Sequence, residues 1–390
     1  MQGVFLLKGT VKHYDWGGQS FIPDLLNMPN PGNQPFAEYW MGTHHLGMSQ
    51  VLNEAGETVP LSAKTAPLPY LFKVLDVKDM LSIQVHPSKN EAEIEFAREN
   101  AEDIPLDSPL RNYKDDNHKP ELMVALSDFW LLHGFKPEEE IIEVLYNISE
   151  LKELLPVFNQ SGYVGLYRHI MVMPQQEVNR ILKPLLDNIP GIYDEDGPTR
   201  YKEDFWALRA AEIFNKGNDI DRGIFSIYLF NLVFLKKGDA IFQDAGVPHA
   251  YLEGQNIEIM ANSDNVLRGG LTAKNIDVKE LLKHTKCEAT YPQVFTGDVV
   301  NPNEKLFKVP VPDFRLSRLI ADKSETVSVK TDGAEILFLA EGEVLAKDGN
   351  TGIYLKKGEA VFCLPGTLIE LETIANAVIF RAGSSVHISE

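Results

Sequence analysis

Short apolar runs alternate with turn residues along much of the chain, a pattern typical of β-strands. The pattern is clearest from Leu71 to Phe135. Within it, Leu81–His86 alternates apolar and polar residues, and this alternation places Gln84 and His86 on the same face of a strand. Pro87 ends the predicted strand. The sequence therefore predicts a β protein in which one strand presents two polar side chains together.

The apolar spacing changes to that of helices between Pro137 and about Arg222. The residues that keep helical spacing there are Ile141, Leu145, Ile148, Leu151, Leu155, Val178, Ile181, Leu182, Leu185, Trp206, Ala210 and Ile213. A shorter helix is predicted over 92–100, because Ser88 and Glu91 form a capping box before it. The strand pattern returns after Gly223, with a strand expected within Phe225–Phe234. We therefore expect a module of three or more helices inserted into a β protein.

One octapeptide occurs twice, 120 residues apart. Leu235–Phe242 reads LKKGDAIF and Leu355–Phe362 reads LKKGEAVF, which predicts one β-hairpin unit in each of two domains. The first copy is followed by a Gly-Val-Pro turn and His249, whereas the segment after the second copy has no histidine. We expect ligand-type chemistry at the first copy only. Two short-stranded, glycine-punctuated units favour jelly-roll barrels.

Charge and composition narrow the possible partners. The chain has 37 basic and 56 acidic residues and a formal net charge of −19, whereas a nucleic-acid binder or a protein attracted to anionic lipids usually shows a basic surface. Its apolar runs are shorter than the roughly 20 residues of a membrane helix, and Met1–Lys8 is too short for a signal-peptide core. Two cysteines, Cys287 and Cys363, are too few for a disulfide framework. We expect a cytoplasmic protein that acts on a small molecule and binds neither nucleic acid nor membrane.

Several side chains could hold a metal ion. Gln84 and His86 form a pair on one strand face, and Glu121, His249 and, less obviously, His118 could complete a ligand set from distant segments. A single histidine is more often structural than a ligand, so each residue alone is a weak signal. The other seven histidines are assigned structural or surface positions: His13, His44, His45, His133, His169, His284 and His387.

A second group of polar residues lies downstream. Asn256–Met260 alternates as a strand and would turn Glu258 to the same face as its two end residues. The loop that follows carries Arg268 and Lys274, two cations close together in an acidic protein. The loop could be a surface turn, or it could seat an anionic substrate, since arginine presents a planar fork that matches phosphate oxygens. The residues alone leave both readings open.

Six ordered motifs resemble those of the type I zinc-dependent mannose-6-phosphate isomerases of the cupin superfamily. They are Tyr14-Asp-Trp-Gly17, Ala37-Glu-Tyr-Trp-Met-Gly42, Leu81-Ser-Ile-Gln-Val-His-Pro87, Asn117-His-Lys-Pro-Glu121, Pro248-His-Ala-Tyr251 and Met260-Ala-Asn-Ser-Asp-Asn-Val-Leu-Arg268. The resemblance implies a mainly β fold of cupin-type jelly-roll barrels with an α-helical domain. It implies a zinc-binding cupin core over 1–135 and 223–300, a helical insertion over 136–222, and a cupin-like β domain over 301–390 without metal ligands.

The resemblance also implies an activity and a set of site residues. The activity is reversible isomerisation of mannose 6-phosphate and fructose 6-phosphate through an enediol or enediolate. One zinc ion per chain would be held by Gln84, His86, Glu121 and His249. The catalytic arginine matches Arg268, the active-site lining matches Lys119, Tyr251, Glu258, Asp264 and Lys274, and Ser82 would lie near the phosphate. The proton-transfer base stays open among Lys119, Glu258 and Asp264.

Two positions depart from the family pattern, because Gly269 and Ala273 stand where the loop after the arginine usually has alanine and proline. These changes affect the stiffness of the loop and remove no charged group. Two alternatives to the isomerase remain. One is an iron or manganese cupin oxygenase, since similar nitrogen and oxygen ligands bind those metals. The other is a cupin that binds sugar phosphates without catalysis.

Overall fold

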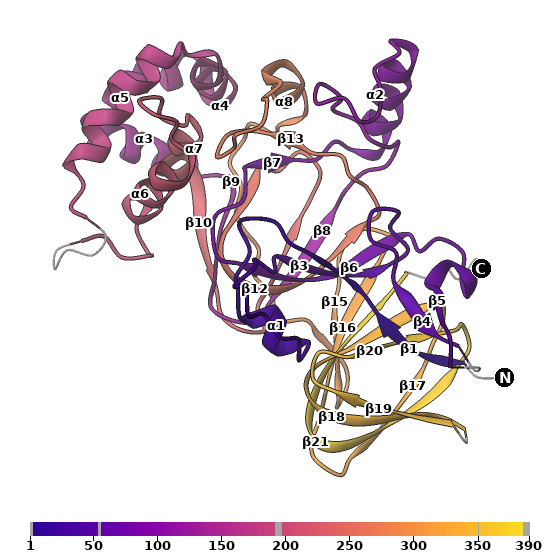
Figure 1. The fold of residues 1–390 in the computed structure, drawn as a ribbon. Helices are drawn as coiled ribbons and strands as arrows, with labels where there is room; N and C mark the ends of the chain where they lie inside the picture. Colours follow the sequence, from indigo (N-terminus) through magenta and orange to yellow (C-terminus); the bar gives the residue numbers. More distant parts are fainter. Residues whose placement is uncertain (1–2, 54–55, 192–196, 350, 385–390) are drawn as a thin grey trace.

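The computed structural model describes residues 3–53, 56–191, 197–349 and 351–384, and the chain in these ranges is mostly β-sheet (Figure 1). The named strands form a ten-stranded and an eleven-stranded sheet, and all their pairings are antiparallel. A group of helices gathers beside β10 at one end of the molecule, away from the C-terminal strands drawn in yellow (Figure 1). The prediction of a mainly β protein is confirmed.

The ten-stranded sheet is formed by strands between Thr10 and Arg268. They are β2 (Thr10–Lys12), β3 (Glu38–Gly42), β6 (Tyr70–Val77), β7 (Gln84–Val85), β8 (Glu121–Ala125), β9 (Phe129–Phe135), β10 (Phe230–Leu235), β11 (Ala240–Gln243), β12 (His249–Ala261) and β13 (Leu267–Arg268). The strand predicted over Leu81–His86 is thus shorter than expected. The long strand β12 pairs with β6, β7, β8 and β9, and in this register His249 lies opposite Gln84. Strand pairing therefore brings together residues that are far apart in the sequence.

The eleven-stranded sheet joins the two ends of the described chain. Its strands are β1 (Val4–Lys8), β4 (Gln50–Leu52), β5 (Thr58–Pro60), β14 (Asp298–Asn301), β15 (Glu304–Phe307), β16 (Arg315–Ala321), β17 (Thr326–Lys330), β18 (Glu335–Asp348), β19 (Thr351–Lys356), β20 (Ala360–Cys363) and β21 (Leu368–Gly383). β1 lies between β20 and β4, so β1, β4 and β5 belong to the same sheet as the last strands of the described chain.

Alternate side chains of β6 face two different parts of the protein. Phe72 points to the eleven-stranded sheet, where its ring lies edge-on to that of Phe338 at 6.3 Å. Tyr70 points the same way, and its hydroxyl donates a hydrogen bond to the carbonyl of Ala382 at 3.1 Å. Lys73 lies on the opposite face because strand side chains alternate. One strand therefore joins the two sheets and carries a charged group to the other side.

Most of the helices lie in the segment between β9 and β10, where helical spacing predicts them. The helices are α1 (Phe21–Leu25), α2 (Lys89–Ala101), α3 (Glu138–Asn147), α4 (Leu155–Val172), α5 (Gln175–Asn188), α6 (Glu203–Phe214), α7 (Gly223–Leu229) and α8 (Val278–His284), with 3₁₀ turns at Leu61–Ala63 and Lys152–Leu154. The predicted capping box is present at α2, since Ser88 and Glu91 each bond the other's backbone N–H.

Two predictions about local structure are wrong. The residues from Gly223 to Leu229 form α7, and the predicted strand begins only at Phe230. Every residue of α7 is buried, so its apolar run has no polar face and its spacing does not separate a helix from a strand. The octapeptide repeat is not a hairpin: β10 pairs with β9 and β11 with β8, while β19 and β20 both pair with β18.

The repeat encodes a tight turn instead of a strand pair. In the first copy the backbone N–H of Lys236 donates to the Asp239 carboxylate at 2.9 Å, and in the second Lys356 donates to Glu359 at 2.8 Å. Equivalent residues therefore form the same turn in both copies. The strands on either side of each turn pair with other strands and not with each other. Among the described helices, none is both long and apolar enough to cross a membrane.

Candidate active site

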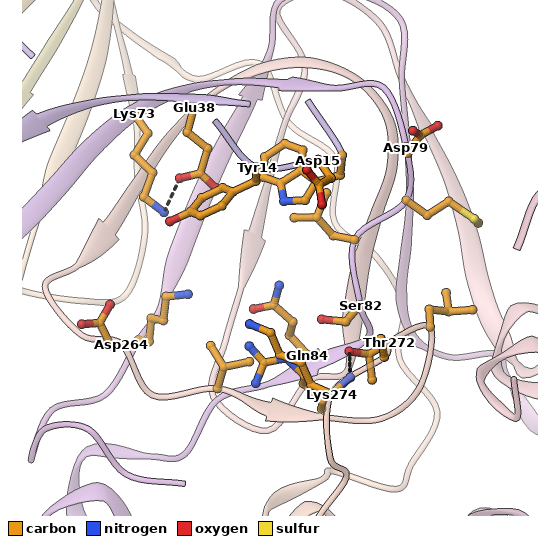
Figure 2. A pocket seen from close by; sticks show the side chains of 18 of the residues that line it. Tyr14, Asp15, Glu38, Lys73, Asp79, Ser82, Gln84, Asp264, Thr272 and Lys274 are labelled. Atoms are coloured by element: carbon orange, nitrogen blue, oxygen red, sulfur yellow. Dashed lines mark hydrogen bonds and ion pairs between the residues drawn. The ribbon is translucent and has the colours of Figure 1, made fainter. Parts of the chain in front are cut away.

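A cavity of about 740 Å³ opens beside the ends of β7 and β13 (Figure 2). It is in the size range of small-molecule pockets. Six predicted site residues line it: Ser82, Gln84, Lys119, Asp264, Arg268 and Lys274. A smaller cavity of about 60 Å³ is lined by Gln84 and Lys119 again, together with the predicted residues Glu121, His249, Tyr251 and Glu258. His86 lines neither cavity and is fully buried. The site residues therefore form two adjoining groups.

Three of the four predicted metal ligands meet in one buried cluster. Glu121 lies at the start of β8, and its Oε1 is 3.5 Å from Nε2 of His86 while its Oε2 is 3.2 Å from Nε2 of His249. The two imidazole centroids are 5.2 Å apart. One ligand atom of each residue lies within 4.8 Å of the others. This spacing suits a single ion bound by all three.

The hydrogen bonds of the two histidines leave their lone pairs facing the cluster. Nδ1 of His86 donates to the carbonyl of Asn265 at 2.8 Å, and Nδ1 of His249 donates to the carbonyl of Val247 at 2.9 Å. Each Nε2 then carries a lone pair and faces the Glu121 carboxylate, an arrangement that repels unless a cation lies between them. Nε2 of His86 is buried without a hydrogen-bond partner. Burial lowers the pKa of His86 to about 4, which keeps it a neutral ligand. The cluster therefore fits a divalent metal ion.

Of the two remaining ligand candidates, Gln84 lies near the cluster and His118 does not. Gln84 lies opposite His249 in the sheet and lines the small cavity together with Glu121, so it is within the same group. His118 does not join the cluster, because its Nε2 bonds Asp313 at 2.9 Å. Of the histidines assigned to structural or surface positions, His387 lies outside the described residues.

A charged pair adjoins the cluster on the face of β6 that Lys73 occupies. Nζ of Lys73 is 2.8 Å from Oε1 of Glu258, and the hydroxyl of Tyr251 donates to Oε2 of Glu258 at 2.9 Å. Burial raises the pKa of Glu258, and Lys73 partly opposes this rise. Burial likewise raises the pKa of Tyr251 well above its ordinary value. Both carboxylate oxygens of Glu258 are thus engaged by donors.

Lys119 links the cluster to the large cavity. Its Nζ is 3.0 Å from Oε1 of Glu121, and it lines both cavities. Burial alone would raise the pKa of Glu121, but the charge of Lys119, together with hydrogen bonds from neighbouring side chains, holds it well below the usual range. Glu121 is therefore an anion at neutral pH, as a metal ligand requires.

Arg268 and Lys274 lie in the cavity without acidic partners. Within the described ranges, no carboxylate oxygen lies within the 4.0 Å of an ion pair from either side chain. Burial lowers the pKa of Arg268, and the nearby Arg268 charge lowers the pKa of Lys274. Figure 2 shows Lys274 beside Thr272 and Ser82 on one side of the cavity. Two unpaired cations next to a hydroxyl are suited to an anionic group.

Asp264 lies on another side of the cavity, and His44 holds its carboxylate. Nε2 of His44 is 3.3 Å from Oδ1 of Asp264, and Nδ1 of His44 accepts the backbone N–H of Leu46 at 3.2 Å. Burial tends to raise the pKa of Asp264, but His44 lowers it below the ordinary value. His44, His45 and Asp264 also bring three ligand atoms within 4.8 Å. Since Leu46 occupies the lone pair on Nδ1, a neutral His44 carries its proton on Nε2 and is a poor ligand there.

Two site residues escaped the sequence analysis. Lys73 lines the small cavity, although most residues of its strand are apolar. Its Nζ is 4.0 Å from Oε2 of Glu38, and Figure 2 marks this ion pair with a dashed line. Glu38 also accepts a hydrogen bond from the Trp40 indole. A lysine inside a buried apolar strand is itself a signal, because a charge is seldom buried without a partner. That signal predicts an acidic partner but does not identify it.

Comparison with known proteins identifies the family. Residues 4–138 match the model of the type I phosphomannose isomerase catalytic domain. Mannose-6-phosphate isomerase of Escherichia coli is 39% identical over 381 residues, which cover 91% of this chain and 93% of the relative. The human enzyme is 32% identical over 429 residues, covering 97% and 98%. A crystal structure of the Salmonella typhimurium enzyme bound to fructose 6-phosphate and zinc matches with a TM-score of 0.85 and 33% identity, covering 99% of this chain and 100% of that one.

The fold thus places the chain in a class of metal-binding sugar isomerases, and the buried His–Glu–His cluster has the spacing to hold a metal ion. The chain is a member of the type I mannose-6-phosphate isomerase family.

Proposed function

We propose that the chain interconverts mannose 6-phosphate and fructose 6-phosphate. The observation that carries this proposal is the cluster of His86, Glu121 and His249 beside a cavity that also holds two unpaired cations. Isomerisation moves one proton between C1 and C2 of the sugar and builds negative charge on the carbonyl oxygen. Fixed positive groups next to that oxygen lower the barrier. The cavity supplies such groups in Arg268 and Lys274.

The cofactor is one zinc ion per chain, held by His86, Glu121, His249 and Gln84. Support comes from the buried lone pairs that face one another and from the zinc named for the related Salmonella structure. Three protein ligands of this kind leave room for a fourth, neutral one, and Gln84 is placed to provide it. When bound, zinc polarises oxygen atoms of the substrate as a Lewis acid.

Arg268 stabilises the charge that develops on the substrate oxygens, since it is a cation that lines the cavity without an acidic partner. We assign the proton transfer to Lys119, which alone among the three candidates lines both cavities. A base needs a free lone pair, so Lys119 acts as the neutral amine, after the metal has replaced it as the partner of Glu121. Glu258 has both oxygens bound by donors, and Asp264 has a lowered pKa that makes it a weak base. These two carboxylates balance the positive charge and orient the groups around them.

Lys274 and Ser82 bind the phosphate group. Both line the large cavity, and Lys274 has no carboxylate that competes for its charge among the described residues. The family resemblance predicts Tyr251 in the lining of the active site, and its hydroxyl donates a hydrogen bond to Glu258 at 2.9 Å. We infer that Tyr251 supports the substrate pocket by holding this carboxylate in place.

We further propose that the two sheets are cupin-type jelly-roll barrels. The zinc-binding barrel would comprise 1–135 and 223–300, the helical insertion 136–222, and the second barrel 301–390. The turn shared by the two octapeptide copies supports this division, because it occurs once in each sheet region. β1, β4 and β5 lie within 1–135 but belong to the second sheet, so this segment would contribute strands to both barrels.

The proposal is tested with purified, metal-analysed protein. We expect conversion of fructose 6-phosphate to mannose 6-phosphate, loss of turnover on chelation, and recovery with zinc. Reaction in deuterated water should place deuterium on C1 or C2 of recovered sugar phosphate, because a side chain carries the migrating proton. Oxygen uptake without isomerisation would favour the oxygenase alternative, and binding of sugar phosphate without turnover would favour the non-catalytic one. Either result would overturn the isomerase proposal.

A further inference from the structure

The loop from Gly269 to Lys274 is held by one carboxylate of the helical segment. Asp221 precedes α7, and its Oδ1 accepts the backbone N–H of Gly223 at 2.7 Å and of Leu271 at 2.8 Å. Its Oδ2 accepts the N–H of Thr272 at 3.2 Å. Two of these three amides belong to the loop, so the carboxylate ties the loop to the start of α7. Hydrogen bonds to an ionised acceptor are stronger than neutral ones.

The backbone of the loop is strained and has to be stabilised by contacts of this kind. Leu271 has a φ of +51° although it carries a buried branched side chain, and this left-handed conformation costs roughly 1–2 kcal/mol. The adjoining Gly270 has a φ of +124°, and a Cβ built on it would lie only 2.4 Å from Cα of Gly223. The loop therefore presses directly against the backbone of α7. A strained conformation of this kind persists only where its surroundings determine it.

Part of the loop that Asp221 holds lines the large cavity. Oγ1 of Thr272 accepts the backbone N–H of Lys274 at 3.1 Å, and both residues line the cavity (Figure 2). Nζ of Lys216, also in the helical segment, donates to the carbonyl of Ala273 at 3.3 Å. The loop must keep the Lys274 charge close to Arg268, two like charges that repel in the absence of an anion. Contacts from the helical segment oppose that repulsion.

We propose that Asp221 is a positioning residue that fixes the Gly269–Lys274 loop in the conformation that receives the substrate phosphate. It sets the affinity for the phosphorylated sugar and leaves the rate of proton transfer almost unchanged, because it lies behind the loop and away from the metal ligands. The inference rests on the proposed function and adds to it a residue that no sequence motif above contains.

The test compares Asp221→Ala and Asp221→Asn with Asp219→Asn, an exposed carboxylate two residues away. For Asp221→Ala we expect KM for fructose 6-phosphate to rise about tenfold or more, since two hydrogen bonds from the loop to a charged acceptor are lost. Inhibition by inorganic phosphate should weaken by a similar factor. The kcat and the zinc content should stay close to those of the unaltered chain. Asp221→Asn keeps one acceptor oxygen and should give an intermediate KM, and Asp219→Asn should behave as unaltered.

Several results would overturn the inference. A fall in kcat with an unchanged KM would place Asp221 at the reacting end of the sugar. A lower melting temperature with normal KM and normal phosphate inhibition would make its role structural only. If the alanine variant does not fold, the nearly isosteric asparagine variant decides. If the unaltered chain showed no turnover, the proposed function would fail, and calorimetry of inorganic phosphate binding to the unaltered chain and the variants would still decide the role of Asp221.

Discussion

The two sheets both bury charged side chains, but they satisfy these charges in opposite ways. In the eleven-stranded sheet, Arg381 bonds Glu335 through Nε at 2.5 Å and through Nη2 at 2.9 Å, and its Nη2 also donates to the carbonyl of Lys330. Glu304 completes the group, with Ser317 donating to it at 2.5 Å. Every charge in this group has a partner inside the protein. The group therefore needs no ligand.

In the ten-stranded sheet Lys73 and Glu258 also pair with each other, but the cluster of His86, Glu121 and His249 is left incomplete. Two imidazole lone pairs face the Glu121 carboxylate, and Nε2 of His86 has no hydrogen-bond partner. Arg268, in the adjoining cavity, has no ion-pair partner among the residues described. A buried polar group without a partner is costly. Buried charge alone therefore does not identify a functional site. Buried polar or charged groups that only a bound ligand or ion can satisfy do identify one.

The largest expected effect comes from removing one incomplete group. We expect His249→Ala to lose zinc and about 10⁴-fold in kcat/KM together, roughly 5.4 kcal/mol of barrier. Metal analysis and a coupled isomerase assay measure both. His169→Ala replaces an exposed histidine of α4 and should change neither. Full activity in metal-free His249→Ala would show that this cluster does not serve the reaction.

Breaking the complete group should affect stability and spare activity. Arg381→Met leaves Glu335 and Glu304 buried without their cation, so we expect a loss of about 3–5 kcal/mol in the free energy of unfolding. Calorimetry of unfolding is the measurement. Arg315→Met, whose arginine is partly exposed beside Asp332 at 3.5 Å, should stay within about 0.5 kcal/mol of the unaltered chain. An inactive but stable Arg381→Met protein would contradict the comparison.

Replacing Arg268 should have the opposite outcome to replacing Arg381: a loss of activity without a loss of stability. We expect Arg268→Ala to lower kcat by about 10²–10³-fold, roughly 2.7–4 kcal/mol, because a fixed positive group is removed from the developing charge. Zinc content and melting temperature should remain as in the unaltered chain, since Arg268 bonds no carboxylate there. Loss of zinc in this variant would mean that its role had been misplaced. Arg180→Ala, an exposed arginine of α5, is the matched control.

The smallest effect should follow from the Lys73–Glu258 pair and should depend on pH. Burial raises the pKa of Glu258 above its ordinary 4.5 and Lys73 lowers it, so Lys73→Met should raise this pKa further. A carboxyl group whose pKa is raised on folding contributes less stability as pH increases through that range. We expect Lys73→Met to cost about 1–3 kcal/mol at pH 8 and clearly less at pH 5.

Urea unfolding at the two pH values measures the effect. Lys78→Met changes an exposed lysine just beyond the same strand and should show no such pH dependence. An equal cost at both pH values would mean that Glu258 stays ionised, or stays protonated, throughout.

Much of the candidate site was accessible from the sequence. Alternation predicted that Gln84 and His86 belong together, and the turn before His249 marked the third segment. The structure adds the physical link, because β7 pairs with β12 and sets Gln84 opposite His249. The helical segment was also predictable, since amphipathic helices such as α5 bury one clear face.

The rest depends on contacts that no local pattern contains. The all-buried α7 gives no periodic signal, so the sequence pattern does not distinguish it from a strand. The repeated turn specifies a bend and leaves the strand partners to distant residues. The role of Lys73 depends on its ion pair with Glu258, and that of Asp221 on its hydrogen bond to the loop at Leu271. Both partners lie far away in the sequence. Side chains that act through long-range partners are recognisable only once the chain is folded.

The place of β1 between β20 and β4 has a consequence for biosynthesis. Leu6 pairs with Val361. The edge of β1 that pairs with β20 therefore stays exposed until nearly the whole chain has left the ribosome. At about 5–20 residues per second, the delay is on the order of 20–70 s. During that time the exposed edge is open to pairing with other nascent chains, and a chaperone that shields residues 4–8 would raise the yield of folded protein.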